Sequence, residues 1–280
     1  MQLIRRIWIA ITLFGLVLGI WGFWWEPSSL RVRRDSVEVP HWPEALDSMH
    51  VAVLTDLHIG SPYKGIDSLR KLVRRTNELQ PDLILLPGDF VIQGVLGGTF
   101  VPPEEIVPEL AKLHAPLGVF AVMGNHDWWL RRPREMIAAF EQNGVPLLLD
   151  DAVRVDAANA PFWVIGIGDF WETDHDVDGA LAMVTDDAPV IAFTHNPDIF
   201  PDMPARVNLT IAGHTHGGQV YIPFVGRPVV PSEFGERYAI DEVREEGRVL
   251  YVSSGVGTSM LPVRFLVPPE ITLLELKASR

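Results

Sequence analysis

The sequence Val51-Ala52-Val53-Leu54-Thr55-Asp56-Leu57-His58 joins a short apolar run to two side chains that can hold metals or protons. The run over residues 51–54 predicts a buried strand, because short apolar segments rich in valine suit a strand covered on both faces. Asp56 and His58 follow it directly. In open α/β sheets, ligands bind at the carboxyl ends of the strands. The stretch therefore predicts a strand whose end carries part of a functional site.

Four further predicted strands end in polar side chains in the same way. These strands are expected at residues 83–86, 119–122, 190–193 and 209–211. The segments that follow them are Gly88-Asp89, Gly124-Asn125-His126-Asp127, Thr194-His195-Asn196 and Gly213-His214-Thr215-His216-Gly217-Gly218. Together the five strands would bring ionisable side chains to one edge.

The remaining pattern predicts a single α/β domain. Amphipathic or helical stretches cover residues 66–79, 104–114 and 134–143, and further strands are expected at 163–167, 249–252 and 271–274. Strands that alternate with helices favour sheets that are covered by helices.

Composition narrows the classes of function. The chain has 280 residues, no cysteine and a net charge of −13, from 23 Lys and Arg against 36 Asp and Glu. The lack of cysteine excludes disulfides, thiolate zinc sites and a cysteine nucleophile. An acidic chain is poorly suited to tracking a nucleic-acid backbone, so no nucleic-acid partner is expected. It can still act on phosphates if bound metal ions supply positive charge.

The amino terminus predicts an uncleaved membrane anchor. Residues 7–25 carry no charge and end in an aromatic group that includes Trp21, Trp24 and Trp25. As a helix they span about 28 Å, close to the hydrocarbon thickness of a bilayer. A core helix is disfavoured because the run is apolar all round, and a cleaved signal peptide because no small-x-small site follows. We expect an anchor over residues 1–26, a juxtamembrane connector over 27–47 and a catalytic domain over 48–280.

The charges around this segment bear on its orientation. Arg5 and Arg6 precede it, while Arg31, Arg33 and Arg34 follow it, so the positive-inside count is nearly balanced. The short basic start resembles a signal-anchor. This favours a single-pass protein of the inner membrane with an extracytoplasmic catalytic domain, and the oligomeric state stays open.

The residue types at the strand ends are those that hold two divalent metals. Carboxylate, neutral imidazole and amide oxygen suit Mn, Fe or Zn. Two metals about 3.5–4 Å apart need a shared carboxylate, and Asp89, alone after its strand, is the natural bridge. In Asp56-x-His58 and His214-x-His216, alternate side chains would point the same way if the backbone is extended.

This ordered set of motifs resembles the calcineurin-like metallophosphoesterase superfamily over residues 48–276. The flanking segments 194–198, 212–219, 261–265 and 268–270 are similar to a bacterial branch of membrane-associated or exported phosphodiesterases. The resemblance implies an α/β/β/α fold, a β-sandwich of two mixed sheets flanked by helices.

The resemblance also assigns roles by position. It implies that one metal is held by Asp56, His58, Asp89 and His216, and the other by Asp89, Asn125, His195 and His214. His126 would contact the phosphoryl group or protonate the leaving oxygen, with Asp127 orienting it. A metal-bridged hydroxide would attack phosphorus in line.

The leading hypothesis is therefore a membrane-anchored, dimetal phosphoesterase, with phosphodiester hydrolysis favoured and a lipid-linked substrate left open. One alternative is a UDP-2,3-diacylglucosamine-type pyrophosphate hydrolase, although the better-known bacterial form has arginine where this chain has His126. A purple acid phosphatase is disfavoured because His58 fills the second position of the first motif. An inert metal-binding module on the same fold would show decayed ligands, and none is missing here.

Three other groups of residues stay ambiguous in the sequence. Trp128 and Trp129 predict either an apolar rim for substrate or core packing. The acidic run 169–178 favours a solvated loop over a third metal site, and Asp169 within it follows a predicted strand at the same edge. Residues 253–255 would form a turn or line the site.

A basic group follows the two tryptophans. Arg131, Arg132 and Arg134 would lie on a helix surface or meet phosphate or lipid headgroups.

Overall fold

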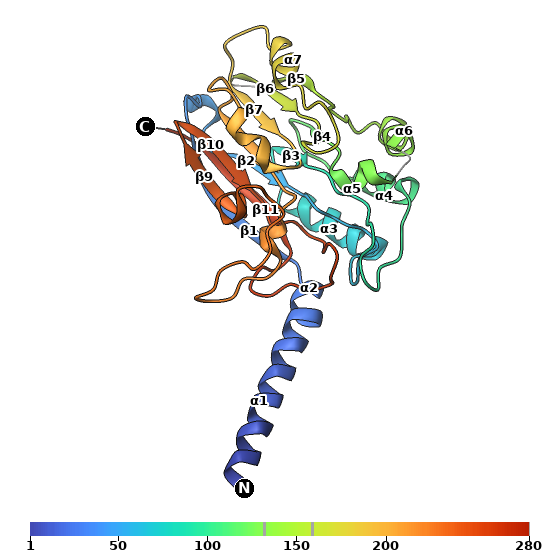
Figure 1. Cartoon of the computed structure of the whole chain (residues 1–280). Helices are drawn as coiled ribbons and strands as arrows, with labels where there is room; N and C mark the ends of the chain where they lie inside the picture. Colours follow the sequence, from blue (N-terminus) through green and yellow to red (C-terminus); the bar gives the residue numbers. More distant parts are fainter. Residues whose placement is uncertain (131–132, 158–159, 280) are drawn as a thin grey trace.

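A computed structural model of the chain, described here for residues 1–130, 133–157 and 160–279, shows two stacked β-sheets with helices on their outer sides (Figure 1). The first sheet has the strand order β1 (Arg31–Val39), β11 (Glu270–Ala278), β2 (Met49–Val53), β3 (Leu83–Leu86) and β4 (Val119–Ala121). The order in the second is β5 (Asp151–Asp156), β6 (Pro161–Gly166), β7 (Val190–Phe193), β8 (Leu209–Ala212), β10 (Arg248–Val252) and β9 (Asp241–Glu245).

Both sheets are mixed. The strands β2, β3 and β4 run parallel, as do β6, β7, β8 and β10, while β11, β5 and β9 each pair antiparallel with one neighbour. The parallel strands therefore send their carboxyl ends to a common edge. The predicted α/β architecture of two mixed sheets flanked by helices is confirmed.

Side chains alternate between two apolar layers along the buried strands. On β2, Val51 and Val53 face the second sheet, and Ala52 faces the helices α3 (Ile66–Glu78), α4 (Pro103–Leu110) and α6 (Pro133–Asn143). A third apolar cluster packs the outer face of the second sheet against α7 (Val177–Ala182) and the 3₁₀ helix Pro197–Asp202. Because side chains alternate between two apolar layers, both faces of these strands are apolar. Polar side chains therefore gather where the strands end.

The expected strands and helices are present, with small shifts at their ends. The three strands that sequence reasoning missed, β1, β5 and β9, lie at sheet edges. The predicted connector over residues 27–47 is corrected in part, because residues 31–39 form β1 and pair in parallel with β11. Its first residues are charged and only Val37 and Val39 are buried, so its pattern is that of a strand with one open face.

The amino-terminal helix α1 (Gln2–Ile20) leaves the body of the molecule (Figure 1). With a π-helical turn (Trp21–Trp25) and α2 (Glu26–Ser28), it forms one helical stretch that is long and apolar enough to cross a membrane. Only 6% of its most apolar 18-residue segment is buried inside the domain.

The far end of this helical stretch is fixed to the domain. The Arg264 backbone N–H donates to the carbonyl of Gly22 at 2.9 Å, and the Tyr63 hydroxyl donates to the carbonyl of Phe23 at 3.1 Å. Glu26 is buried and accepts a hydrogen bond from the backbone N–H of Val267 at 2.5 Å. The helix therefore ends as part of the folded body.

We predict that Val37→Ala lowers the free energy of unfolding by about 2–3 kcal/mol, because it removes buried methyl groups from the layer between the sheets. Glu38→Ala, one residue along β1 and exposed, is the matched control and should change stability by less than about 0.5 kcal/mol. Denaturant unfolding measures both. Equal small effects would show that residues 31–39 behave as a connector.

Candidate metal centre

The loops after β2, β3, β4, β7 and β8 bring all predicted site residues together. Asp56 and His58 follow β2, Asp89 follows β3, and His195 follows β7. Asn125, His126 and Asp127 open the short helix α5 (Asn125–Trp129), while His214 and His216 follow β8. None of these nine side chains belongs to a residue more than 8% exposed.

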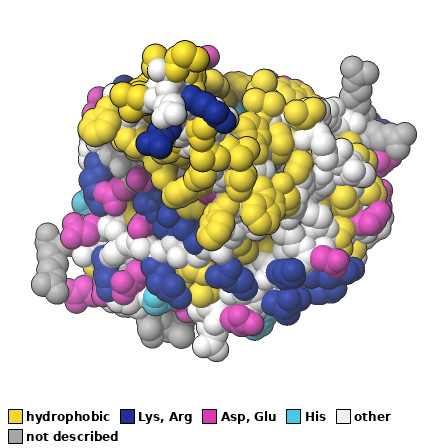
Figure 2. Space-filling view, turned by 90° about the horizontal axis from the view of Figure 1, so that it is seen from below, with side chains coloured by type: hydrophobic (Ala, Val, Ile, Leu, Met, Phe, Trp, Pro, Cys, Tyr) yellow, Lys and Arg dark blue, Asp and Glu magenta, His cyan; other side chains and the backbone are white. Residues whose placement is uncertain are grey.

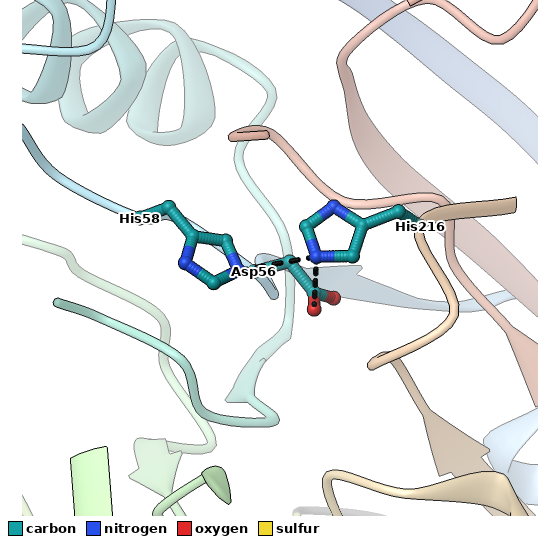
Figure 3. A group of neighbouring side chains, drawn as sticks. All are labelled: Asp56, His58 and His216. Atoms are coloured by element: carbon teal, nitrogen blue, oxygen red, sulfur yellow. Dashed lines mark hydrogen bonds and ion pairs between the residues drawn. The ribbon is translucent and has the colours of Figure 1, made fainter. Parts of the chain in front are cut away.

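One group of side chains that could hold a metal ion comprises Asp56, His58 and His216 (Figure 3). The Nε2 atoms of His58 and His216 lie 3.1 Å apart, and the His216 Nε2 lies 3.3 Å from Asp56 Oδ1. Three donor atoms from two loops thus face one small space.

A second group lies beside the first. The His195 Nε2 is 3.1 Å from both Asn125 Oδ1 and His214 Nδ1. The other ring nitrogen of His195 lies 2.7 Å from the carbonyl of Pro87. A hydrogen bond donated there by Nδ1–H directs the Nε2 atom into the site.

Asp89 lies between the two groups. Its Oδ2 is 3.4 Å from His58 Nε2 and 3.2 Å from His195 Nε2. Its Oδ1 accepts a hydrogen bond from the His126 backbone N–H at 2.9 Å. A single oxygen thus faces one histidine of each group, which is the position a bridging carboxylate would take.

The protonation states of Asp89 and of three of the histidines suit metal binding. Burial lowers the pKa of His58 to about 3 and holds the pKa values of His214 and His216 well below the usual range, so these imidazoles are neutral. Burial acts to raise the pKa of Asp89, but His195 and His126 outweigh it and hold this pKa well below its usual range. Burial acts to lower the pKa of His195, but Asp89 outweighs it and raises this pKa to about 10, so His195 must lose its proton when a metal binds. Ionised carboxylate, neutral imidazole and amide oxygen are donors that fit Mn, Fe or Zn.

The loops reach this geometry through left-handed backbone. Asp56, His58, Asp89, His214 and His216 have φ of 51°, 41°, 58°, 68° and 52°. Each such residue costs on the order of 1 kcal/mol or more, so neighbouring contacts must hold it. The expectation that alternate side chains align on extended backbone is therefore corrected, because successive left-handed turns direct both pairs.

Glycines allow the β3 and β4 loops to approach each other. A Cβ atom on Gly124 would lie 2.3 Å from Asp89 Oδ1 and 2.8 Å from the Cγ of His195. A Cβ on Gly88, which has φ of 89°, would lie 2.4 Å from the Gly124 nitrogen. A side chain at Gly124 would displace Asp89, and one at Gly88 would displace the backbone at Gly124.

Asp127 has a role that was not predicted from the sequence. Its carboxylate accepts backbone N–H bonds from Asp89 (2.8 Å), Gly124 (3.0 Å), Phe90 (2.9 Å) and Val91 (3.3 Å). Its hydrogen bonds within the described ranges do not include the His126 ring. Asp127 therefore positions the loop of Asp89, and its expected role in orienting the His126 ring stays a prediction.

His126 lies at the edge of the two groups. Its ring centroid is 4.8 Å from that of His58 and 4.9 Å from that of Trp129, and its Nε2 is 3.5 Å from the hydroxyl of Ser259. Burial lowers its pKa. A neutral imidazole beside the metal-binding atoms can accept or donate a proton near neutral pH.

An exposed aromatic pair borders the centre. Trp129 (40% exposed) and Trp171 (43%) have ring centroids 6.5 Å apart, and Trp171 lies 4.4 Å from the His214 ring. Of the predicted pair, Trp129 is thus at the rim, whereas Trp128 packs against the core. Trp171 was not predicted as a site residue. It lies in an acidic loop, and the contact of this loop with the site joins segments that are far apart in the sequence.

Arg264 was also missed. This fully buried side chain donates to the carbonyls of Ser254 (2.8 Å) and Gly257 (2.6 Å), and its Nη2 lies 3.3 Å from His216 Nδ1. It therefore holds residues 253–257 beside the metal-binding atoms. The resemblance included residues 261–265, but the burial of Arg264 depends on contacts between distant segments, so its role could not be predicted from the local sequence.

The structure distinguishes the readings left open for the acidic run 169–178 and for Arg134. Asp169 is buried and accepts the N–H groups of Trp171 and Glu172, while the other acids of residues 169–178 are exposed, as a solvated loop predicts. Arg134 is exposed at the start of α6. Arg131 and Arg132 lie outside the described residues.

Comparison with known proteins decides the family. The family model for calcineurin-like phosphoesterases matches residues 49–218. The chain belongs to the calcineurin-like phosphoesterase family. As a calcineurin-like phosphoesterase it is a metal-dependent phosphoester hydrolase, and the family predicted from the motifs is confirmed.

Relatives in this family match most of the chain. It is 31% identical to the phosphodiesterase YaeI of Escherichia coli (81% of each chain) and 29% identical to the metallophosphoesterase YkuE of Bacillus subtilis (91% of this chain, 88% of the relative). It is 27% identical to the UDP-2,3-diacylglucosamine pyrophosphatase LpxG of Chlamydia trachomatis (91% and 92%).

We predict that Asp127→Asn weakens metal binding by about 10–100-fold, because the amide cannot accept all the N–H groups that fix the Asp89 loop. Asp82→Asn is the control, since Asp82 also accepts a backbone N–H, that of His50 at 2.7 Å, but precedes β3 at the opposite end of the sheet. Metal titration of both variants measures the effect. Equal affinities would contradict the positioning role.

Proposed function

We propose that the chain is a membrane-anchored phosphodiesterase with two divalent metal ions. Asp56, His58, Asp89 and His216 would hold one ion, and Asp89, Asn125, His195 and His214 the other. The observation that carries this proposal is the position of Asp89, whose Oδ2 lies within 3.4 Å of His58 Nε2 and 3.2 Å of His195 Nε2.

The bound ions would supply positive charge to the phosphoryl oxygens and lower the pKa of a coordinated water. The protein's own contribution is rigidity. The buried hydrogen bonds of Asp127 and Arg264 fix the loops before substrate arrives, so little reorganisation is needed during the reaction.

His126 would act on the leaving group. It is buried and has a lowered pKa. One of its ring nitrogens lies within 4.8 Å of donor atoms of His58 and Asp89, although neither proposed ligand set includes it. A neutral imidazole there would hold a proton on one nitrogen and donate it to the departing oxygen. The Ser259 hydroxyl, 3.5 Å away, would restrict the rotation of the ring.

A second candidate function is pyrophosphate hydrolysis of a UDP-2,3-diacylglucosamine-type substrate. It is favoured by the match to LpxG over 91% of the chain and by the exposed pair Trp129 and Trp171 beside the centre. Hydrolysis of UDP-2,3-diacylglucosamine at a higher kcat/KM than that of bis-p-nitrophenyl phosphate would select this candidate. The reverse order would favour a general phosphodiesterase.

We predict that Asp89→Asn loses both metals and activity, because an amide cannot neutralise two cations as the shared carboxylate does. His126→Ala should keep both metals and lose about 10²–10⁴-fold in kcat, the range for a general acid. Metal analysis and bis-p-nitrophenyl phosphate hydrolysis measure both. His114→Ala should match the wild type, because His114 is an exposed histidine that belongs to none of the motifs. A metal-free Asp89→Asn protein with full activity would refute the assignment.

We also propose that residues 1–26 anchor the chain in the inner membrane with the catalytic domain outside the cytoplasm. The apolar, exposed helix Gln2–Ser28 supports a membrane segment. An alkaline phosphatase reporter fused after Arg280 should then be active, and a green fluorescent protein at the same position dark. The opposite pattern would place the domain in the cytoplasm.

A further inference from the structure

A hollow of about 780 Å³ lies where the helical stretch of the amino terminus meets the domain. One wall is made by Ser28, Ser29 and Leu30, at the end of the amino-terminal helical stretch, and the other by residues 63–68 and the exposed side of α3. The hollow is thus next to the predicted membrane surface and separate from the metal-binding residues, none of which lines it.

The lining is strongly basic although the whole chain is acidic. Lys64, Arg70, Lys71 and Arg75 line the hollow, against the single acid Asp67, in a chain of net charge −13. Asp67 is paired with Arg70, which also reaches Glu109. Lys71 is exposed, and no ion pair or hydrogen bond of its side chain is found within the described ranges.

Lys64 is a buried amine without a carboxylate partner among the described residues, and its burial and the nearby Arg264 lower its pKa to about 7. It is 2% exposed, and its ammonium donates to the carbonyl of Ser29 at 2.9 Å. No carboxylate lies within ion-pair distance of it in residues 1–130, 133–157 and 160–279. A buried ammonium is costly without a negative partner. An anion in the hollow would supply that partner.

The first turn of α3 adds backbone donors. Its N-cap is Gly65, which has no side chain to accept the free N–H groups of Ile66, Asp67 and Ser68. All four residues line the hollow. Free N–H groups at a helix start favour a phosphate or similar anion.

The surrounding face is suited to lie against a bilayer. Figure 2 looks along the amino-terminal helix and shows hydrophobic side chains gathered around it, with Lys and Arg side chains beside them. Phe224, Met260 and Leu261 are exposed by 107%, 73% and 49%. Their loops are tied to the helix end, because the N–H of Arg264 bonds Gly22 and that of Tyr221 bonds Phe265.

We propose that this hollow binds the phosphate group of an anionic phospholipid. This proposal rests on the membrane anchor of the proposed function, and it does not depend on the phosphodiesterase reaction. The lipid phosphate would lie between Lys64, Lys71 and the start of α3, with its acyl chains beside the amino-terminal helix. Lipid phosphates lie at the level where such a helix leaves the hydrocarbon. A bound headgroup would fix the rotation of the domain about the anchor.

The test uses the full chain in a neutral detergent with a chelator present, so that no turnover occurs. Thermal unfolding is followed with dihexanoylphosphatidylglycerol, with dihexanoylphosphatidylcholine and with inorganic phosphate. The anionic lipid should raise the midpoint by about 5 °C or more at saturation, and the other two should have little effect. Lys71→Glu should weaken the apparent affinity about tenfold or more, with Lys71→Gln between it and the wild type.

Arg74→Glu is the matched control, because it reverses an exposed charge on the same helix outside the hollow. It should respond to the anionic lipid like the wild type. Equal responses of Lys71→Glu and Arg74→Glu would overturn the site. An equal response to inorganic phosphate would overturn the lipid assignment, and one to the zwitterionic lipid would overturn selectivity for negative charge. Because activity is not the readout, failure here leaves the phosphodiesterase proposal separately testable.

Discussion

The buried carboxylate of Asp89 connects most loops of the site, since its Oδ2 faces His58 and His195 while its Oδ1 accepts the N–H of His126. Two divalent cations bound at neighbouring positions repel each other, and a negative charge between them reduces this repulsion. The carboxylate of Asp89, which lies between the two ligand groups, can supply that negative charge. The left-handed backbone at Asp89, the close approach of Gly124 and the N–H bonds to Asp127 all serve to place this group.

The sheets make that placement rigid. Each loop starts from a strand buried on both faces, so the position of the loop is set by close-packed side chains above and below it. Asp127 and Arg264 then extend the same rigidity into the loops, through hydrogen bonds to backbone groups. The strain of five left-handed residues is sustained because the scaffold leaves these loops few other conformations.

Sequence reasoning could predict the buried strands and the residues at their ends, because apolar runs and the polar motifs after them are local features. It missed β1, β5 and β9, whose edge positions leave one side without a strand partner and allow charged residues. The roles of Asp127 and Trp171 and the burial of Arg264 depend on contacts between segments far apart in the chain. No spacing rule contains that information.

A continuous set of contacts joins the end of the amino-terminal helical stretch to the candidate metal ligands. Glu26 accepts the N–H of Val267, whose carbonyl accepts from Arg264, and the Arg264 Nη2 lies 3.3 Å from His216 Nδ1. These groups are buried, so a shift of the helix end would leave a carboxylate or a guanidinium without partners. The end of the helical stretch is therefore a structural part of the domain, whereas α1 leaves the body of the molecule. The position of this end relative to the candidate metal centre is fixed by the same packing that fixes the centre itself.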